Sequence, residues 1–129
     1  MYLNCHSYYS LRYGTISIED LTAEAKKNSI EVLALTDINN SMGTIDFVKE
    51  CRINGIKPIA GIEFRDDKHQ LLYTAIALNN KGFREINEFL TYHNLSETQL
   101  PSVPPFFHHA YIIYPWEIDR GPETLGVWN

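Results

Sequence analysis

The stretch that decides the fold is "EVLALTD", residues 31–37, a mainly apolar run that ends in Thr36 and Asp37. A compact apolar run of this length is typical of a parallel strand buried on both faces. Parallel strands need crossover connections, which are usually helices, so helical segments are expected on both sides of this strand. The sequence therefore predicts an α/β fold that is built outward from residues 31–37.

Segments of helical pattern flank this strand. The preceding segment "SIEDLTAEAKKN" predicts a helix that Ser17 caps, with Asp20 as a capping-box-like partner. The following segment "SMGTIDFVKECRINGI" predicts a second helix, with Gly55 just after its end. Helical spacing places four residues on the inner side of this second helix: Ile45, Val48, Cys51 and Arg52.

Further strands and one more helix complete the pattern. "MYLNC" (1–5), "KPIAGIEFRD" (57–66), "HQLLYTAIALN" (69–79) and "AYIIYP" (110–115) are predicted strands. A turn at residues 66–68 joins two of them, so this pair could be antiparallel. "KGFREINEFLTYHN" predicts a third helix, a proline-rich loop covers about 95–109, and "RGPETLGVWN" reads as a turn and a possible last strand.

Composition narrows the classes of function. Of the 129 residues, 44% are hydrophobic and 21% are charged, as expected for a single domain that spans residues 1–129. No apolar run reaches about 18 residues, and the first residues lack the pattern of a signal peptide, so no membrane association is expected. Two distant cysteines, Cys5 and Cys51, fit reduced thiols in a cytoplasmic protein. A net charge of −5 predicts weak or no direct DNA binding.

Polar residues stand at the C-terminal ends of the predicted strands. Asn4 and His6 end the first strand, Asp37 and Asn39 end the second, and Glu63 lies in the third. Since these ends meet at one edge of a parallel sheet, the five side chains are expected close together. Clusters of histidine and carboxylate hold metal ions in phosphoesterases, because the ions polarise the phosphoryl oxygen and lower the pKa of bound water.

The same residues also have structural interpretations. From residue types alone, His6 is more often a hydrogen-bonded histidine at a strand end than a ligand, and Asp37 is equally an N-cap or turn residue. The amide of Asn4 is a poorer ligand for zinc or manganese than an imidazole would be. Glu63 requires a partner, because a carboxylate within the apolar run "IAGIEF" is costly to bury alone.

Residues 3–64, from "LNCHSYYSLRYGT" through "EVLALTD" to "GIEF", closely resemble the N-terminal PHP (polymerase and histidinol phosphatase) domain of the alpha subunit of bacterial DNA polymerase III. The resemblance continues through "LLYTAIALNNKGFREINEFL" and more loosely through "YIIYP" and "LGVWN". It implies that this α/β chain is the first part of a distorted, PHP-type (β/α) barrel of mainly parallel strands, which is longer than this chain in the family.

The resemblance also locates six metal-ligand positions of the family. His6 and Glu63 keep a ligand type, whereas the other four positions have lost theirs: Asn4, Tyr13, Ile38 and Leu72. It therefore implies a degenerate metal site, with no catalytic residue and no bound metal or other cofactor in this segment. Apolar packing of Tyr13, Ile38 and Leu72 could fill the space, leaving His6 and Glu63 close enough to bond.

The function implied is that of the N-terminal PHP segment of a replicative DNA-directed DNA polymerase, a nucleotidyltransferase whose reaction would belong to residues outside this chain. The segment would have a structural or docking role. Its partners would be the rest of the alpha chain and replisome proteins, and the late strands could support a homodimer. Two alternatives remain open: an active PHP phosphoesterase (histidinol-phosphatase-like or a 3′–5′ exonuclease), and a small stand-alone binding protein.

Overall fold

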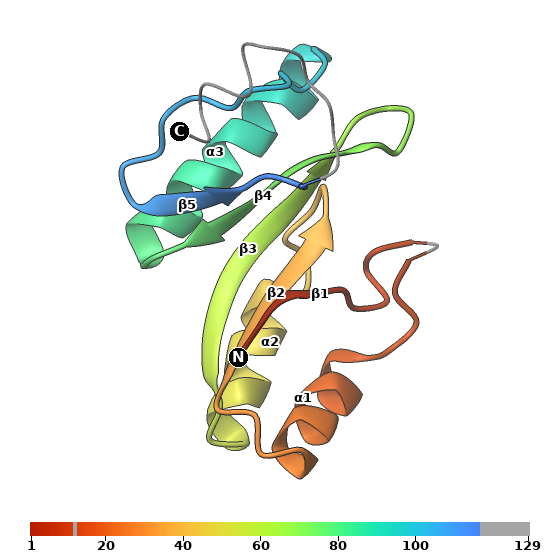
Figure 1. Ribbon diagram of the computed structural model, residues 1–129, viewed down its shortest axis with the longest axis vertical. Helices are drawn as coiled ribbons and strands as arrows, with labels where there is room; N and C mark the ends of the chain where they lie inside the picture. Colours follow the sequence, from red (N-terminus) through yellow and green to blue (C-terminus); the bar gives the residue numbers. More distant parts are fainter. Residues whose placement is uncertain (12, 117–129) are drawn as a thin grey trace.

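The computed structural model describes residues 1–11 and 13–116 (Figure 1). Five strands and three helices follow one another in the predicted order: β1 (Tyr2–Cys5), α1 (Ile18–Lys27), β2 (Val32–Ile38), α2 (Thr44–Ile53), β3 (Lys57–Arg65), β4 (Leu71–Ala77), α3 (Asn80–Ser96) and β5 (Ala110–Ile113). The strand predicted within residues 120–129 lies outside the described residues. None of the helices in the described part has the length and apolar character needed to cross a bilayer.

The strands form one sheet in the order β1-β2-β3-β4-β5. β1, β2 and β3 are parallel, as the flanking helices predict, and the β3–β4 and β4–β5 pairs are antiparallel. The α/β class is therefore confirmed. Within the described residues the sheet is mixed and open, with β1 and β5 at its two edges. In the register of β2 and β3, Ile38 lies beside Glu63, which brings the predicted site residues to one end of the parallel strands.

Two apolar clusters hold the helices to the sheet. The first joins α1 and α2 to β2 through Ile18, Leu33, Leu35 and Phe47. The second joins α3 to the β3–β4 pair, and its buried members are Ile62, Phe64, Tyr73, Ala75, Ile86 and Leu90. Figure 1 shows the same division, with α1 and α2 beside the lower part of the sheet and α3 beside the upper part.

The helix ends follow the sequence signals. The Ser17 hydroxyl accepts a hydrogen bond from the backbone N–H of Asp20, with 3.1 Å between the nitrogen and oxygen, so the predicted cap of α1 is confirmed. Gly55, just beyond α2, has φ = 70°, a backbone conformation that glycine adopts without steric strain.

The predicted inner face of α2 is wrong at two of its four positions. Cys51 is buried and Val48 is partly buried, but Ile45 is 67% exposed and Arg52 is exposed as well. The buried residues of α2 are instead Thr44, Phe47 and Cys51. Apolar residues stand at both 45 and 47, so two overlapping stripes fit helical spacing, and the fit of Phe47 against β2 selects the other one.

Candidate functional site

Glu63 is the centre of the candidate site. Its side chain is only 1% exposed, and it accepts hydrogen bonds from Asn4 in β1 and from His6, which directly follows β1. Its Oε1 atom lies 3.1 Å from Nε2 of His6 and 3.3 Å from Nδ2 of Asn4. The contact between His6 and Glu63 that the sequence predicted is therefore present, and it links β1 to β3 across β2.

The other oxygen of Glu63 contacts Arg65. The Arg65 Nε atom lies 2.6 Å from Oε2 of Glu63, and the arginine side chain is 17% exposed. The guanidinium also donates to the carbonyl of His69 over 2.8 Å and lies 4.7 Å from the centre of the Tyr13 ring. A cation over an aromatic face is attracted by the electrons of the ring. The site thus contains a cation that is supplied by the chain itself.

The carboxylate of Glu63 is kept ionised by these neighbours. Burial alone would raise its pKa, but the hydrogen bonds and charges of His6 and Arg65 outweigh burial and hold the pKa of Glu63 below its ordinary value. Asn4 adds a neutral donor, and its own Oδ1 accepts from the Thr36 hydroxyl over 2.9 Å. Hydrogen bonds therefore fix the orientation of Asn4 at both ends of its amide.

These side chains do not fit a divalent metal ion. Both oxygens of Glu63 already bind donors, and the guanidinium of Arg65 lies where a metal would have to approach Oε2. Asn4 supplies an amide where the resemblance implies an imidazole, and amides are weak ligands for zinc. In the part of the chain that the structure describes, no three His, Cys, Asp or Glu side chains form a cluster that could hold a metal ion.

The structure brings together three of the six predicted positions directly: Asn4, His6 and Glu63. Tyr13 joins them through Arg65, and Ile38 is the register partner of Glu63 on β2. Leu72 instead packs against the second apolar cluster, next to a register shift between β3 and β4.

Asp37 is neither the metal ligand nor the N-cap or turn residue that its sequence context suggested. It is 1% exposed, and three donors lie within 2.7 Å of its oxygens: the Ser7 backbone N–H, the Ser7 hydroxyl and the Ser10 hydroxyl. The Ser10 hydroxyl in turn accepts from the N–H of Ile38. Asp37 lies inside β2 and is not the N-cap of α2, which is Gly43. It anchors the segment after β1 to β2.

Two further features position these groups: Asn39, which the sequence placed at this edge, and Gly14, which no sequence signal identified. The Asn39 side chain pairs with the backbone of Arg65, donating to its carbonyl and accepting from its N–H over 2.9 Å each way. This pairing extends the β2–β3 contact past the end of β2. Gly14 lies so close to the Ser7 carbonyl that an added Cβ would overlap it, so the loop closes only with glycine there.

Arg65 could have been identified from a sequence rule. Residues two apart on a strand point to the same face, so Arg65 shares a face with Glu63. A buried carboxylate requires a partner, and an arginine at that spacing is a candidate. The anchoring role of Asp37 had no comparable signal, because its partners lie 27 and 30 residues away in the sequence.

Comparison with known proteins places this architecture in a family. Residues 3–114 match the PHP domain family. A solved structure from Bifidobacterium adolescentis, provisionally assigned as a metal-dependent phosphoesterase, has a TM-score of 0.53 and 16% sequence identity. The similarity covers 73% of this chain and 33% of that one. At this identity, the similarity shows a shared fold.

Several of the similar proteins are DNA polymerase III alpha subunits. The DNA polymerase III subunit alpha of Chlamydia muridarum is 49% identical over 61 residues, which are 47% of this chain and 5% of that protein. The same subunit of Ureaplasma parvum is 38% identical over 84 residues, 65% of this chain and 8% of that protein. An error-prone DNA polymerase of Symbiobacterium thermophilum is 34% identical over 97 residues, 75% of this chain and 9% of that protein.

This chain thus spans less than a tenth of the length of these relatives. The part that they share is the region of strands and helices described above, and the homology is to the N-terminal region of DNA polymerase III alpha subunits. The chain belongs to the PHP domain family.

Proposed function

We propose that this chain serves as the N-terminal PHP segment of a cytoplasmic DNA polymerase III alpha polypeptide and acts there as a structural or docking module without hydrolase activity. Its open sheet would be the first part of a distorted barrel. Nucleotidyl transfer would belong to residues outside this chain. Its partners would be the rest of the alpha chain and other replisome proteins.

The observation that carries the proposal is the ion pair between Arg65 and Glu63. Hydrolysis of phosphate esters by metal ions needs a set of ligands that holds the ions and leaves positions open for substrate and water. Here the retained carboxylate is bound by a guanidinium, a histidine and an amide, so its charge is already balanced. The arrangement stabilises the ends of β1 and β3, as expected for a metal site that has become structural.

The two alternatives have less support. An active phosphoesterase would need the imidazoles that Asn4 and Ile38 replace, and the similarity to a solved phosphoesterase extends to the fold alone. A stand-alone binding protein would leave unexplained why the polymerase relatives match across helices as well as strands.

The first prediction tests the proposed loss of metal chemistry. Protein purified without chelator is expected to contain far less than one equivalent of zinc or manganese by elemental analysis. It should not hydrolyse p-nitrophenyl phosphate or a primer end with added metal. Asn4→His should bring little gain, because Arg65 still covers Glu63 and other ligands are absent. A full equivalent of tightly bound metal, or metal-dependent turnover by the unmodified chain, would contradict the proposal.

The second prediction concerns DNA. The chain carries 11 basic and 16 acidic residues, so it lacks the excess of positive charge that phosphate contacts require. Fluorescence anisotropy with labelled primed DNA at physiological salt is expected to give only weak binding. An affinity below about 1 μM that falls steeply with added salt would contradict this expectation.

The third prediction is a homodimer. β5 is an edge strand among the described residues, and its side chains Tyr111 and Ile113 are 64% and 42% exposed. Edge strands with apolar side chains can pair with another chain, and a two-fold axis would satisfy both edges. Sedimentation equilibrium at micromolar concentration should show a dimer, and Tyr111→Lys should weaken it. A clean monomer at all concentrations would contradict the prediction.

A further inference from the structure

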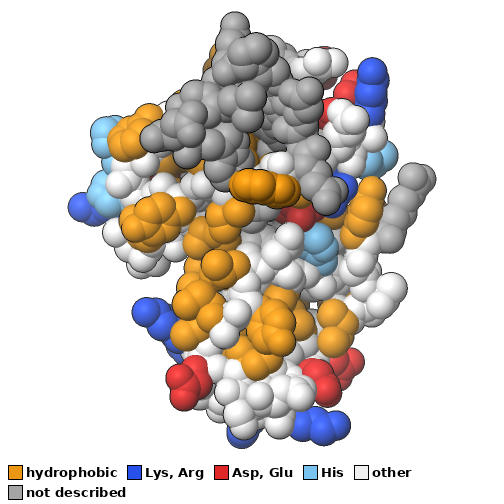
Figure 2. Space-filling model, in the orientation of Figure 1, with side chains coloured by type: hydrophobic (Ala, Val, Ile, Leu, Met, Phe, Trp, Pro, Cys, Tyr) orange, Lys and Arg blue, Asp and Glu red, His pale blue; other side chains and the backbone are white. Residues whose placement is uncertain are grey.

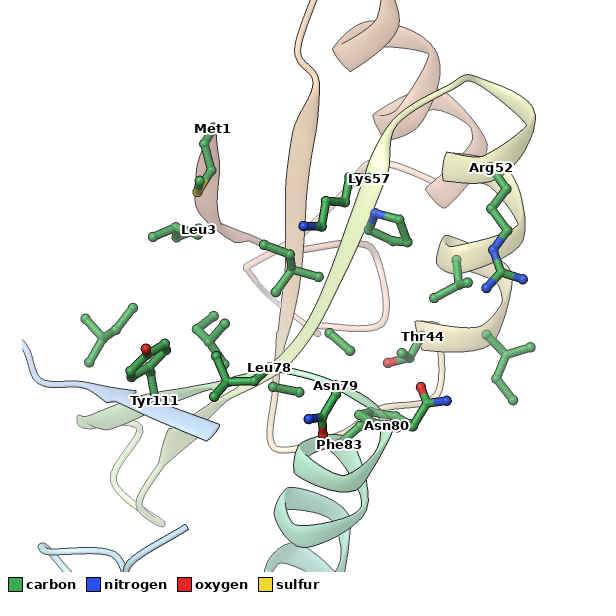
Figure 3. A pocket seen from close by; sticks show the side chains of 18 of the residues that line it. Met1, Leu3, Thr44, Arg52, Lys57, Leu78, Asn79, Asn80, Phe83 and Tyr111 are labelled. Atoms are coloured by element: carbon green, nitrogen blue, oxygen red, sulfur yellow. The ribbon is translucent and has the colours of Figure 1, made fainter. Parts of the chain in front are cut away.

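A large apolar groove lies away from the candidate site, between α2 and the start of α3. Its volume is about 950 Å³, and the first half of β3 runs through it (Figure 3). The labelled side chains come from separate elements: Thr44 and Arg52 from α2, Lys57 from β3, and Phe83 from α3. Figure 2 shows hydrophobic side chains gathered down the middle of the face viewed there, in keeping with the exposure of Leu3, Leu78 and Tyr111, which also line the groove.

The groove exists because β3 is longer than its neighbour β4. Pairing between β3 and β4 begins at Gly61, so residues 57–60 have a strand neighbour on the β2 side alone. The N–H of Lys57 donates to Glu31 on that side, and alternation along the strand turns the nitrogen of Pro58 toward the groove. Proline has no N–H to donate, so this edge is poorly suited to accept another strand.

A helix face that faces the groove has no partner within the described residues. Ile45, Val48, Lys49 and Arg52 follow the spacing i, i+3, i+4 and i+7 along α2, and all four line the groove. Ile45 is 67% exposed. Three of these residues, Ile45, Val48 and Arg52, belong to the stripe that the sequence predicted to be buried, whose fourth member, Cys51, is buried in the first apolar cluster. Residues at this spacing form the ridge against which a second helix packs.

The charges at the groove have one sign. Lys49, Arg52 and Lys57 line it, and none of them forms an ion pair with a carboxylate in residues 1–11 or 13–116. They are three of the 11 basic residues in a chain of net charge −5. A second copy that docked here about a two-fold axis would bring the same three cations to the same place, so the charges favour a different, acidic partner.

We propose that this groove binds an amphipathic helix of a partner polypeptide whose apolar stripe packs against Ile45, Val48 and the first half of β3, and whose carboxylates pair with Lys49, Arg52 and Lys57. Helices that dock in this way place apolar side chains at i, i+3 or i+4, and i+7. The inference does not depend on the absence of metal from the candidate site.

The test uses the full chain and two synthetic peptides of about 18 residues, each with a leucine stripe along one helix face. One peptide has glutamates beside the stripe and the other has lysines. Anisotropy titrations should show the glutamate peptide binding about tenfold more tightly or better. Two-dimensional amide NMR should show shifts confined to α2, the first half of β3 and the start of α3. Lys49→Glu with Arg52→Glu should reverse the preference, and the exposed Ile45→Asp should weaken both peptides.

Lys26→Glu with Lys27→Glu is the matched control, because these two lysines lie in the last turn of α1 and do not line the groove. It should leave the preference unchanged. Equal binding of the two peptides would overturn the proposal. A dimer that Ile45→Asp converts to a monomer would identify a second copy as the occupant, and binding that requires removal of residues 117–129 would identify the chain's own C-terminal segment. Either result would also overturn it.

Discussion

Asp37→Ala is expected to lower the free energy of unfolding by about 4 kcal/mol, the largest effect of any single substitution considered for this chain. The substitution removes a buried acceptor of three hydrogen bonds, each 2.7 Å long. The Ser7 N–H and the two serine hydroxyls then lose their acceptor inside the protein. Because these bonds hold the segment after β1 against β2, the position of His6 should also be disturbed.

Urea unfolding at pH 7 gives the measurement. Asp37→Asn keeps the shape and one acceptor oxygen but replaces the other oxygen with an NH2 donor, so its effect should be smaller, about 1–2 kcal/mol. Asp67→Ala removes an exposed carboxylate and should change stability by less than about 0.5 kcal/mol. If Asp37→Ala proved no more harmful than Asp67→Ala, the anchoring role of Asp37 would be refuted.

Arg65→Met is expected to destabilise the fold by about 3 kcal/mol at pH 7, because it leaves the buried Glu63 carboxylate without the guanidinium that binds its Oε2 atom. In the native chain, the lowered pKa of Glu63 stabilises the fold above the carboxyl group's ordinary pKa, and this stability is lost as the pH falls through the lowered value. Without Arg65, burial and the contact with His6 remain, but one of the two groups that lower the pKa of Glu63 is lost, so the pKa is higher in the variant than in the native chain. The stability lost through the substitution therefore shrinks as the pH falls.

Urea unfolding of both proteins at pH 7 and pH 4.5 tests this pH dependence. The loss caused by Arg65→Met should be clearly smaller at pH 4.5 than at pH 7. Arg84→Met is the matched control: Arg84 pairs with Glu88, but both side chains are mostly exposed, so little change is expected at either pH. A loss of equal size at both pH values would show that Arg65 contributes by packing and not by its charge on Glu63.

Local sequence signals predicted the elements of this fold well. The run "EVLALTD" is the central β2, Ser17 caps α1, and the turn before β4 makes the β3–β4 pair antiparallel. These features depend on neighbouring residues, so a pattern of a few positions is enough to identify them. The inner face of α2 was mistaken, since two stripes fitted the helical period and only packing against β2 decides between them.

The site was predictable where it depended on the order of strands. Asn4, His6 and Glu63 meet because parallel strands end at the same edge. Asp37 was placed correctly at this edge, but its partners Ser7 and Ser10 depend on the path of a loop, which no periodic pattern describes. Arg65 shares a face with Glu63 by strand alternation. The sequence instead predicted apolar side chains, Ile38 and Leu72 among them, as the residues that fill the site around Glu63.

The length of β3 has a consequence for how the molecule unfolds. The first residue of β3, Lys57, directly follows Ile56 of the first apolar cluster. The second half of β3 supplies Ile62 and Phe64 to the second cluster. One continuous stretch of backbone, Ile56 followed by β3, therefore joins the two hydrophobic cores. If either core opened, β3 would lose neighbours along half its length, and its packing against the other core would become weaker. The two halves should therefore behave as a single cooperative unit, despite their separate cores.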